Sequence, residues 1–128
     1  MNKTIMAWGA GFGLLAVILG ALGAHALKAE LDTSAMESYR TAVAYQMYHA
    51  LFLLFLGSTQ VLTGQDRKRV FYLVLSGIFC FSFSIYGLTI GPLAGVDFSP
   101  IGWITPLGGL LLIGGWSVLL YRVFRGLT

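Results

Sequence analysis

Residues 4–27 read TIMAWGAGFGLLAVILGALGAHAL, and no charged side chain occurs between Lys3 and Lys28. The hydrocarbon core of a bilayer is ~30 Å thick, so a helix needs about 20 mostly apolar residues to cross it. This stretch is long and apolar enough, and it predicts a first membrane-spanning helix.

The composition of the whole chain is also typical of a membrane protein. Of its 128 residues, 57% are hydrophobic and 10% are charged, whereas roughly a quarter of the residues of soluble domains are charged. A soluble domain of this size would need more polar surface to cover its core. The net charge of +3 is too small for nucleic-acid binding, but it suits contact with anionic lipid headgroups. The single cysteine, Cys80, excludes an internal disulfide.

Three further apolar segments predict three more spans. Ser34 and Glu37 have the spacing of a helix-capping box at the start of the second one. Gly64 supplies its stop, and Gly91-Pro92 ends the third, because a helix rarely continues through proline. The predicted fold is all-α, a four-transmembrane-helix bundle in one integral membrane domain, residues 1–128, with spans at about 4–27, 38–63, 70–90 and 105–124.

The fourth span is expected to start at Thr105-Pro106, with Thr105 as the N-cap and Pro106 at the first helical position. Residues 92–104 then form a loop. A short interfacial turn after Ser99-Pro100 would seat Trp103 at the lipid headgroups.

Lysine and arginine predict the orientation, because they are enriched in cytoplasmic segments. With four spans, three segments share one side of the membrane: the N-terminus with Lys3, the connector 64–69 and the C-terminal tail. The connector carries Arg67, Lys68 and Arg69, and the tail carries Arg122 and Arg125. Acidic residues dominate the other side, where Lys28 and Arg40 lie among Glu30, Asp32, Glu37 and Asp97. We expect a protein of the bacterial cytoplasmic (inner) membrane with both termini in the cytoplasm.

The N-terminus also imitates a cleavable signal peptide. Lys3, an apolar stretch and Ala24-His25-Ala26 have the order of a basic region, a hydrophobic region and a cleavage site. The apolar stretch is longer than the roughly 7–15 residues of such a hydrophobic region. We therefore expect residues 4–27 to remain as a span.

Small residues recur along two spans at helical spacing. They are Gly9, Gly13, Ala16, Gly20 and Gly23 in the first, and Gly77, Cys80, Ser84, Gly87 and Gly91 in the third. Such stripes let helix backbones approach closely, as in left-handed bundles; the alternative is the general enrichment of glycine in membrane helices. The partner helix could belong to the same chain or to another copy, so a homo-oligomer stays open.

Polar groups inside a bilayer are functional hypotheses by default. His25 lies near the end of the first span and His49, with Tyr45 and Gln46 before it, lies in the second; because these spans are neighbours, the histidines could approach each other. Three interpretations are open. The pair could be structural, it could handle protons, or it could bind a metal or haem. The absence of a CxxCH motif and the presence of two histidines alone argue against haem, so we expect no cofactor and no metal.

Two further groups lie near the outer ends of spans. Arg40 and Glu37 are one turn apart and predict a solvated pair; alternatively, Arg40 holds an anion at the mouth of the bundle. The N–H groups at Thr105, before Gly108-Gly109, could bind an anion or a carbonyl, or this segment is simply a closely packed helix start. The chain has no recognisable catalytic motif, and no carboxylate inside a span that could drive a pump.

Three motifs together resemble a known family. Residues 21–27 (ALGAHAL), 41–51 (TAVAYQMYHAL) and 104–109 (ITPLGG), with Gly115-Trp116, are similar to domain-of-unknown-function family 423, the YgdD-like bacterial inner-membrane proteins related to transmembrane protein 256. Leu22 stands where the family often has phenylalanine. The resemblance implies a four-helix inner-membrane protein and no particular activity, and it places both histidines in signature segments.

Two classes of function follow from these observations. The first is a membrane interaction or scaffold module without enzymatic activity, for which both histidines would be packed and hydrogen-bonded. The alternative is a small transporter or channel for an ion or metabolite, acting as an oligomer, for which a polar cavity would reach His49. A redox or other enzymatic role rests on the two histidines alone.

Overall fold

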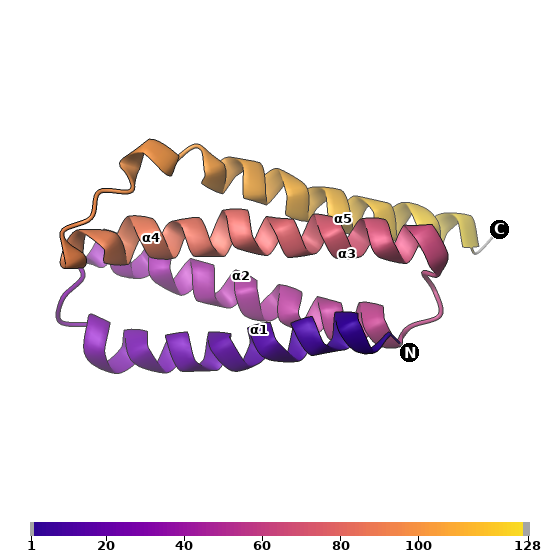
Figure 1. Ribbon diagram of the computed structural model, residues 1–128, viewed down its shortest axis with the longest axis horizontal. Coiled ribbons are helices and arrows are strands. Elements are labelled where there is room, and N and C mark those ends of the chain that lie inside the picture. Colours follow the sequence, from indigo (N-terminus) through magenta and orange to yellow (C-terminus); the bar gives the residue numbers. More distant parts are fainter. Residues whose placement is uncertain (1, 127–128) are drawn as a thin grey trace.

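The computed structural model describes residues 2–126, and within them every regular element is helical. These residues form four helical rods that lie side by side (Figure 1). In chain order the elements are α1 (Lys3–Leu22) with the π-helical turn η1 (Gly23–Leu27), α2 (Thr33–Ser58), α3 (Gly64–Ile78) continued by the π-helical η2 (Phe79–Phe83) and α4 (Ser84–Ile90), the short 3₁₀ helices η3 (Gly91–Ala94) and η4 (Ser99–Ile101), and α5 (Ile104–Gly126).

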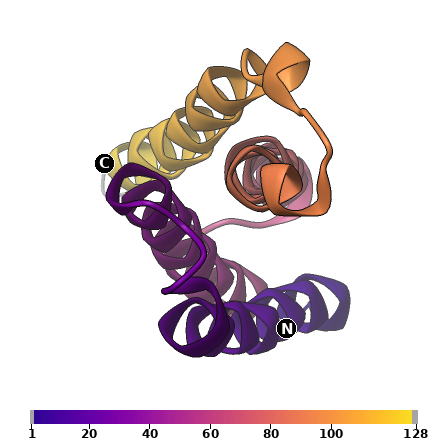
Figure 2. The same cartoon turned by 90° about the vertical axis from the view of Figure 1, so that its left-hand side faces the viewer.

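The rods run up and down in alternation. The N-terminus, the 59–63 connector and the C-terminal end of α5 lie at one end of the bundle, called the terminal end below (Figure 1). The 28–32 and 91–103 connectors lie at the opposite end, called the loop end. Viewed along the bundle, α1 packs on α2, and α5 packs on α3 and η2 (Figure 2). Helix α2 also contacts α3, η2 and α4, and so joins the two pairs.

Three of the rods are long and apolar enough to cross a membrane: Lys3–Leu27, Gly64–Ala94 and Ser99–Gly126. Large apolar side chains face outward along them, including Leu14, Ile113 and Phe124. Helix α2 is also long enough, but it is more polar, and it is not among the helices apolar enough to cross a membrane by composition. The all-helical fold that the sequence predicts is therefore confirmed, together with three segments suited to a bilayer.

The start of α2 differs from the prediction. Asp32 is the N-cap, and its Oδ1 accepts a hydrogen bond from the Ala35 N–H at 2.7 Å, so the expectation that Ser34 caps this helix is wrong. Aspartate and serine cap helices about equally well, and the chain has both of them two residues apart. Local sequence alone therefore did not distinguish the two positions.

The end of α2 also differs from the prediction. The helix stops at Ser58, and Gly64, with φ +57°, is the first residue of α3 and does not terminate α2. The turn between them is stabilised by Arg67, whose guanidinium donates hydrogen bonds to the carbonyls of Leu62, at 3.0 Å, and Thr59. Arg67, which the sequence marked only as a charge, thus holds the turn that follows α2.

The loop end agrees with the prediction at two of three points. The third rod ends at Ile90 before Gly91-Pro92, and a short turn begins at Ser99, as expected. The Ser99 N–H donates to Asp97 Oδ1 at 2.9 Å, and this hydrogen bond lowers the pKa of Asp97 below its ordinary value. However, α5 begins at Ile104, so Thr105 lies inside its first turn and is not the N-cap.

The small residues of the first span face α2 of the same chain. A Cβ on Gly9 would lie 2.9 Å from the Ala50 carbonyl oxygen, whereas one on Gly13 or Gly20 would make ordinary contacts with Ala50 and Val43. Gly23 lies against the ring of Tyr39. This stripe is therefore occupied within the chain and gives no support to a homo-oligomer.

The third rod meets α5 through small residues on both sides. Gly77 receives Leu112, at 2.6 Å from an added Cβ, and Gly115 of α5 receives Val74, at 2.7 Å. Gly108 lies directly against the backbone of Cys80 and Phe81 in η2. At the loop end, Gly87 and Gly91 lie against Phe98 of the connector. The stripe on the third rod thus has a glycine counterpart on α5.

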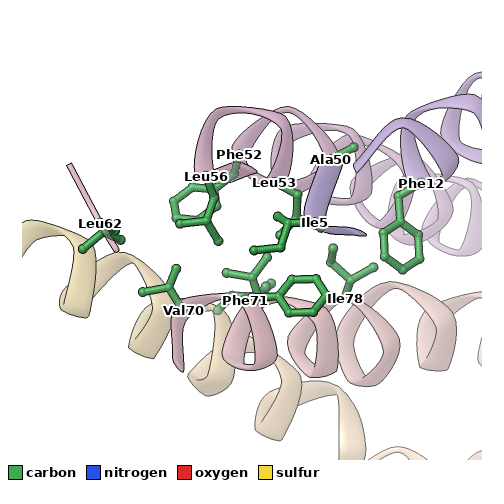
Figure 3. Packing of buried hydrophobic residues seen from close by; sticks show 12 residues of the cluster. Ile5, Phe12, Ala50, Phe52, Leu53, Leu56, Leu62, Val70, Phe71 and Ile78 are labelled. Carbon is green, nitrogen blue, oxygen red and sulfur yellow. The ribbon is translucent and has the colours of Figure 1, made fainter. Parts of the chain in front are cut away.

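Apolar side chains from all four rods form the core. Its largest cluster is centred on Leu53 and Leu56 of α2, which have no exposed surface, and on Val70 and Val74 of α3. Figure 3 shows Ile5 and Phe12 reaching it from α1. A smaller cluster of Leu27, Met36 and Tyr39 closes the loop end between α1 and α2.

The two adjacent glycines of α5 provide a test of this packing. In Gly108→Ala the new Cβ would lie 2.6 Å from the Cys80 carbonyl carbon, whereas in Gly109→Ala the nearest atom is Phe81 Cδ1 at 3.9 Å. Because backbone atoms cannot move aside cheaply, we expect Gly108→Ala to lose about 1–3 kcal/mol of stability. Gly109→Ala should be neutral or gain up to about 1 kcal/mol through helix propensity. Unfolding in detergent micelles measures both, and equal stability of the two variants would contradict the α5–η2 contact.

Candidate functional site

Among residues 2–126, the buried polar side chains inside the bundle are Gln46, His49, Ser82, Ser84 and Thr89. In hydrocarbon a polar group without a partner is costly, so each needs a hydrogen bond within the protein. Among the described residues, no buried side-chain nitrogen or oxygen lacks one.

Gln46 connects three rods. Its side chain is fully buried in α2, and its Nε2 donates to the carbonyl oxygen of Phe12 in α1 at 2.9 Å. Its Oε1 accepts a hydrogen bond from the hydroxyl of Tyr86 in α4 at 2.6 Å. A single amide thus ties both neighbouring rods to α2.

His49 bridges α2 and α5. The indole N–H of Trp116 lies 3.0 Å from His49 Nε2, and because indole is only a donor, Nε2 must be the acceptor. The other ring nitrogen, Nδ1, lies 2.6 Å from the carbonyl oxygen of Tyr45, which is only an acceptor. Nδ1 therefore bears the proton, and the imidazole is neutral with both nitrogens engaged. A proton added at Nε2 would break the bond to Trp116.

Hydroxyl groups make further hydrogen bonds, most of them between rods. Ser82 Oγ donates to the Ala42 carbonyl of α2 at 2.7 Å, and Ser84 Oγ lies 2.6 Å from Thr105 Oγ1 of α5. The Tyr39 hydroxyl donates to the Leu19 carbonyl of α1. Thr89 bonds within its own helix, to the Ile85 carbonyl at 2.8 Å. The buried polar groups therefore form a bonding network between helices.

His25 lies outside this network. Its side chain is exposed in η1, near the loop end. Gly13 faces Ala50, the neighbour of His49, and His25 is twelve residues beyond Gly13 on the same rod, which is roughly 18 Å along a helix. The expectation that the two histidines approach each other is wrong, because the register between α1 and α2 places them at different heights in the bundle.

Tyr45 and Arg40 occupy the outside of α2. The Tyr45 ring is 41% exposed and lies beside the rings of His49 and Phe81, with centroids 6.2 and 5.0 Å away. Arg40 lines a shallow groove between α1 and α2, with Gly20 and Ala24 on the opposite wall. Arg40 and Glu37 both line a second, neighbouring hollow, and no ion pair forms between them. Neither Arg40 nor Glu37 reaches His49.

Thr105 borders a separate hollow at the loop end. A groove of about 580 Å³ lies between the starts of α2 and α5 and the end of α4. Its polar lining comes from Asp32, Ser34, Ser38, Thr89 and Thr105. Asp32 is already engaged as a helix cap, and Thr105 is already engaged with Ser84.

Within the part of the chain that the structure describes, no group of three or more His, Cys, Asp or Glu side chains is placed to hold a metal ion. The separation of the two histidines also removes the arrangement in which both would ligate one haem iron. The buried polar residues therefore bond within the protein, and those that the structure describes are not arranged as ligands of a metal or haem.

Comparison with known proteins places the chain among relatives. The model of a family described as "Protein of unknown function (DUF423)" matches residues 19–109. The chain belongs to the DUF423 family. Its similarity extends to UPF0382 membrane proteins of Staphylococcus aureus, with 34% identity, and Staphylococcus saprophyticus, with 37% identity, each over 96% of this chain and at least 97% of the relative. No solved structure matches it. The resemblance predicted from the three motifs is confirmed, and the relatives' names call them membrane proteins.

For this DUF423 member, sequence reasoning missed three participants in the network: Tyr86, Ser82 and Trp116. Each is an ordinary residue of a membrane helix by type. The usable signal was that an indole N–H or a hydroxyl within a span needs an acceptor. The choice of acceptor depends on how the rods are rotated against one another, which the sequence does not contain.

Tyr86 gives a direct test of the network. In Tyr86→Phe the Oε1 of Gln46 loses its 2.6 Å donor while remaining buried. We expect a loss of about 1 kcal/mol, between the ~0.6 kcal/mol average for hydrogen bonds in membranes and the ~1–3 kcal/mol cost of an unsatisfied buried group. Tyr72→Phe is the matched control, because Tyr72 is 60% exposed and should tolerate the change. Unfolding of both variants in the same micelles decides, and an unchanged Tyr86→Phe would refute the bond.

Proposed function

We propose that this DUF423 member is a non-catalytic interaction or scaffold module of the bacterial cytoplasmic membrane, with four spans and both termini in the cytoplasm. The observation that supports it most is the state of His49. Its exposed fraction is 4%, and both ring nitrogens bond to the protein itself. A side chain used in this way holds helices together and has no free lone pair for chemistry.

The position of α2 supports a fourth span. This helix lies alongside the other rods over its length (Figure 1), so a bilayer crossed by its neighbours surrounds it as well. Its buried polar groups, Gln46 and His49, face other helices and need no water. Residues 41–58 follow the charged first turns and number eighteen, which is roughly 27 Å of helix. This length is close to the ~30 Å hydrocarbon core.

The distribution of charge supports termini in the cytoplasm. The terminal end has six lysines and arginines against one acidic residue, Asp66, whereas the loop end has two against four. Short cytoplasmic segments are the ones enriched in lysine and arginine. The terminal end is therefore assigned to the cytoplasm.

The alternative of a transporter or channel is less well supported. Such a protein needs a polar path on which the interior side chains can exchange partners with a substrate. Here Gln46, Ser82 and His49 are at most 4% exposed, and each is already bonded to another helix. Opening a path would break several of these bonds together.

The orientation can be tested with single cysteines in a Cys80→Ala background. Gln65→Cys in the first turn of α3 at the terminal end should react with a membrane-impermeant maleimide only after the cells are permeabilised, whereas Val96→Cys at the loop end should react in intact cells. Both positions are exposed, so accessibility to the reagent depends on the side of the membrane. Labelling of Gln65→Cys in intact cells would overturn the assignment.

Scaffold and transporter differ in flux. Reconstituted in liposomes with a pH-sensitive dye, the wild-type protein should pass protons and potassium no faster than protein-free liposomes. His49→Gln should be equally silent. His25→Gln is the matched control, because it makes the same substitution at an exposed position outside the network. A wild-type flux that His49→Gln abolishes while His25→Gln and helix content are unaffected would reject the scaffold and establish the transporter.

A further inference from the structure

A groove of about 560 Å³ opens sideways between the first and third rods. Its α1 wall is formed by Thr4, Trp8, Gly11 and Leu15, and its other wall by Phe79 and Phe83 of η2. The volume falls within the ~300–1,000 Å³ of typical ligand pockets. Apart from Thr4, the walls are apolar.

The groove has the direction of a lipid acyl chain. From Thr4 to Leu15 it follows α1 for eleven residues, which is roughly 17 Å along the helix axis. Helix α1 and the third rod are both long and apolar enough to cross a membrane. The groove therefore runs along the membrane normal, with its Thr4 end near one headgroup layer.

Gly11 leaves open space on the α1 wall of the groove. An added Cβ on Gly11 would meet no atom within 4 Å, unlike Gly9 on the α2 side, where the Ala50 carbonyl oxygen lies 2.9 Å away. Packing inside the protein therefore does not require a glycine at position 11. A larger side chain there would fill the groove while leaving the fold intact.

Uncommitted positive charge lies at the Thr4 end. Arg67 is bonded to the carbonyls of its own turn, and Arg69 and Arg122 share Asp66 at 3.5 and 3.1 Å. Within the described residues, the ammonium groups of Lys3 and Lys68 have no hydrogen bond or ion pair. Lys3 adjoins Thr4, and Lys68 precedes Phe79 by eleven residues, or three helical turns, so it lies on the same face of its rod.

We propose that this groove binds one anionic phospholipid, with an acyl chain between Trp8 and Phe79 and the phosphate near Lys3 and Lys68. The apolar walls match the chain, the Thr4 hydroxyl is the polar group at the headgroup end of the walls, and two free ammonium groups attract the phosphate. Each lysine near a membrane surface favours an anionic lipid by about fivefold. The two factors multiply, so the pair predicts a preference of about 25-fold over a zwitterionic lipid.

Trp8 reports on the groove, because bromine on an acyl chain quenches tryptophan fluorescence at contact. The purified protein is reconstituted in phosphatidylcholine with a minor fraction of brominated phosphatidylglycerol or, in parallel, brominated phosphatidylcholine. The signal that Trp8→Phe removes is the Trp8 signal. We expect brominated phosphatidylglycerol to quench it at about a 25-fold lower fraction than brominated phosphatidylcholine.

Three variants separate the contributions. Lys3→Gln with Lys68→Gln should abolish the preference for the anionic lipid, and Gly11→Leu should reduce Trp8 quenching by both lipids. Ala10→Leu, on the exposed face of α1 outside the groove, is the matched control and should leave quenching unchanged. Equal quenching by both lipids in the wild-type protein overturns the proposal. Absence of Trp8 quenching by either lipid also overturns the proposal. If two chains then crosslink, and Trp8→Phe abolishes the crosslink, a second copy is the occupant.

Discussion

The amide of Gln46 is fully buried and has no water to bind, and this constraint determines where α2 lies. Its two hydrogen bonds reach the Phe12 carbonyl of α1 at 2.9 Å and the Tyr86 hydroxyl of α4 at 2.6 Å, while His49 takes a third partner, Trp116, from α5. A helix with these needs can be placed only between the other rods. The rod that is not among the three apolar candidate spans is therefore the one that joins the others, and the outer faces of those three are free to be apolar.

Two kinds of contact hold the rods together. Small residues bring rods together in pairs: Gly9 admits the backbone of α2 to α1, and Gly77 and Gly108 admit α5 to the third rod. Polar side chains then join the two pairs, through Gln46, Ser82 and His49. Dispersion forces act wherever surfaces are smooth, whereas hydrogen bonds require one rotation and one height. The polar bonds therefore select a single arrangement among those that the glycines permit.

Sequence reasoning succeeded where the signal is local. The apolar stretch after Lys3 and the Gly91-Pro92 break each depend on a few adjacent residues, and the family was recognised from three short segments. It failed where two elements must be placed relative to each other. The separation of His25 from His49 depends on the register of α1 against α2, and the partner of His49 depends on the rotation of α5. At the start of α2, Asp32 and Ser34 were both acceptable caps, and only the rest of the chain distinguishes them.

The network also changes where function should be sought. Four of the polar residues that the family-like segments contain, Gln46, His49, Thr105 and Trp116, are bonded to other residues of the same chain. The chemistry that suggested an internal site is thus used in folding. What remains available lies on the outside: the apolar surfaces of α1 and α5, the groove at the loop end and the lysines of the terminal end. In the proposed function these surfaces face lipid or the membrane interface, so the proposal places recognition at the perimeter of the bundle.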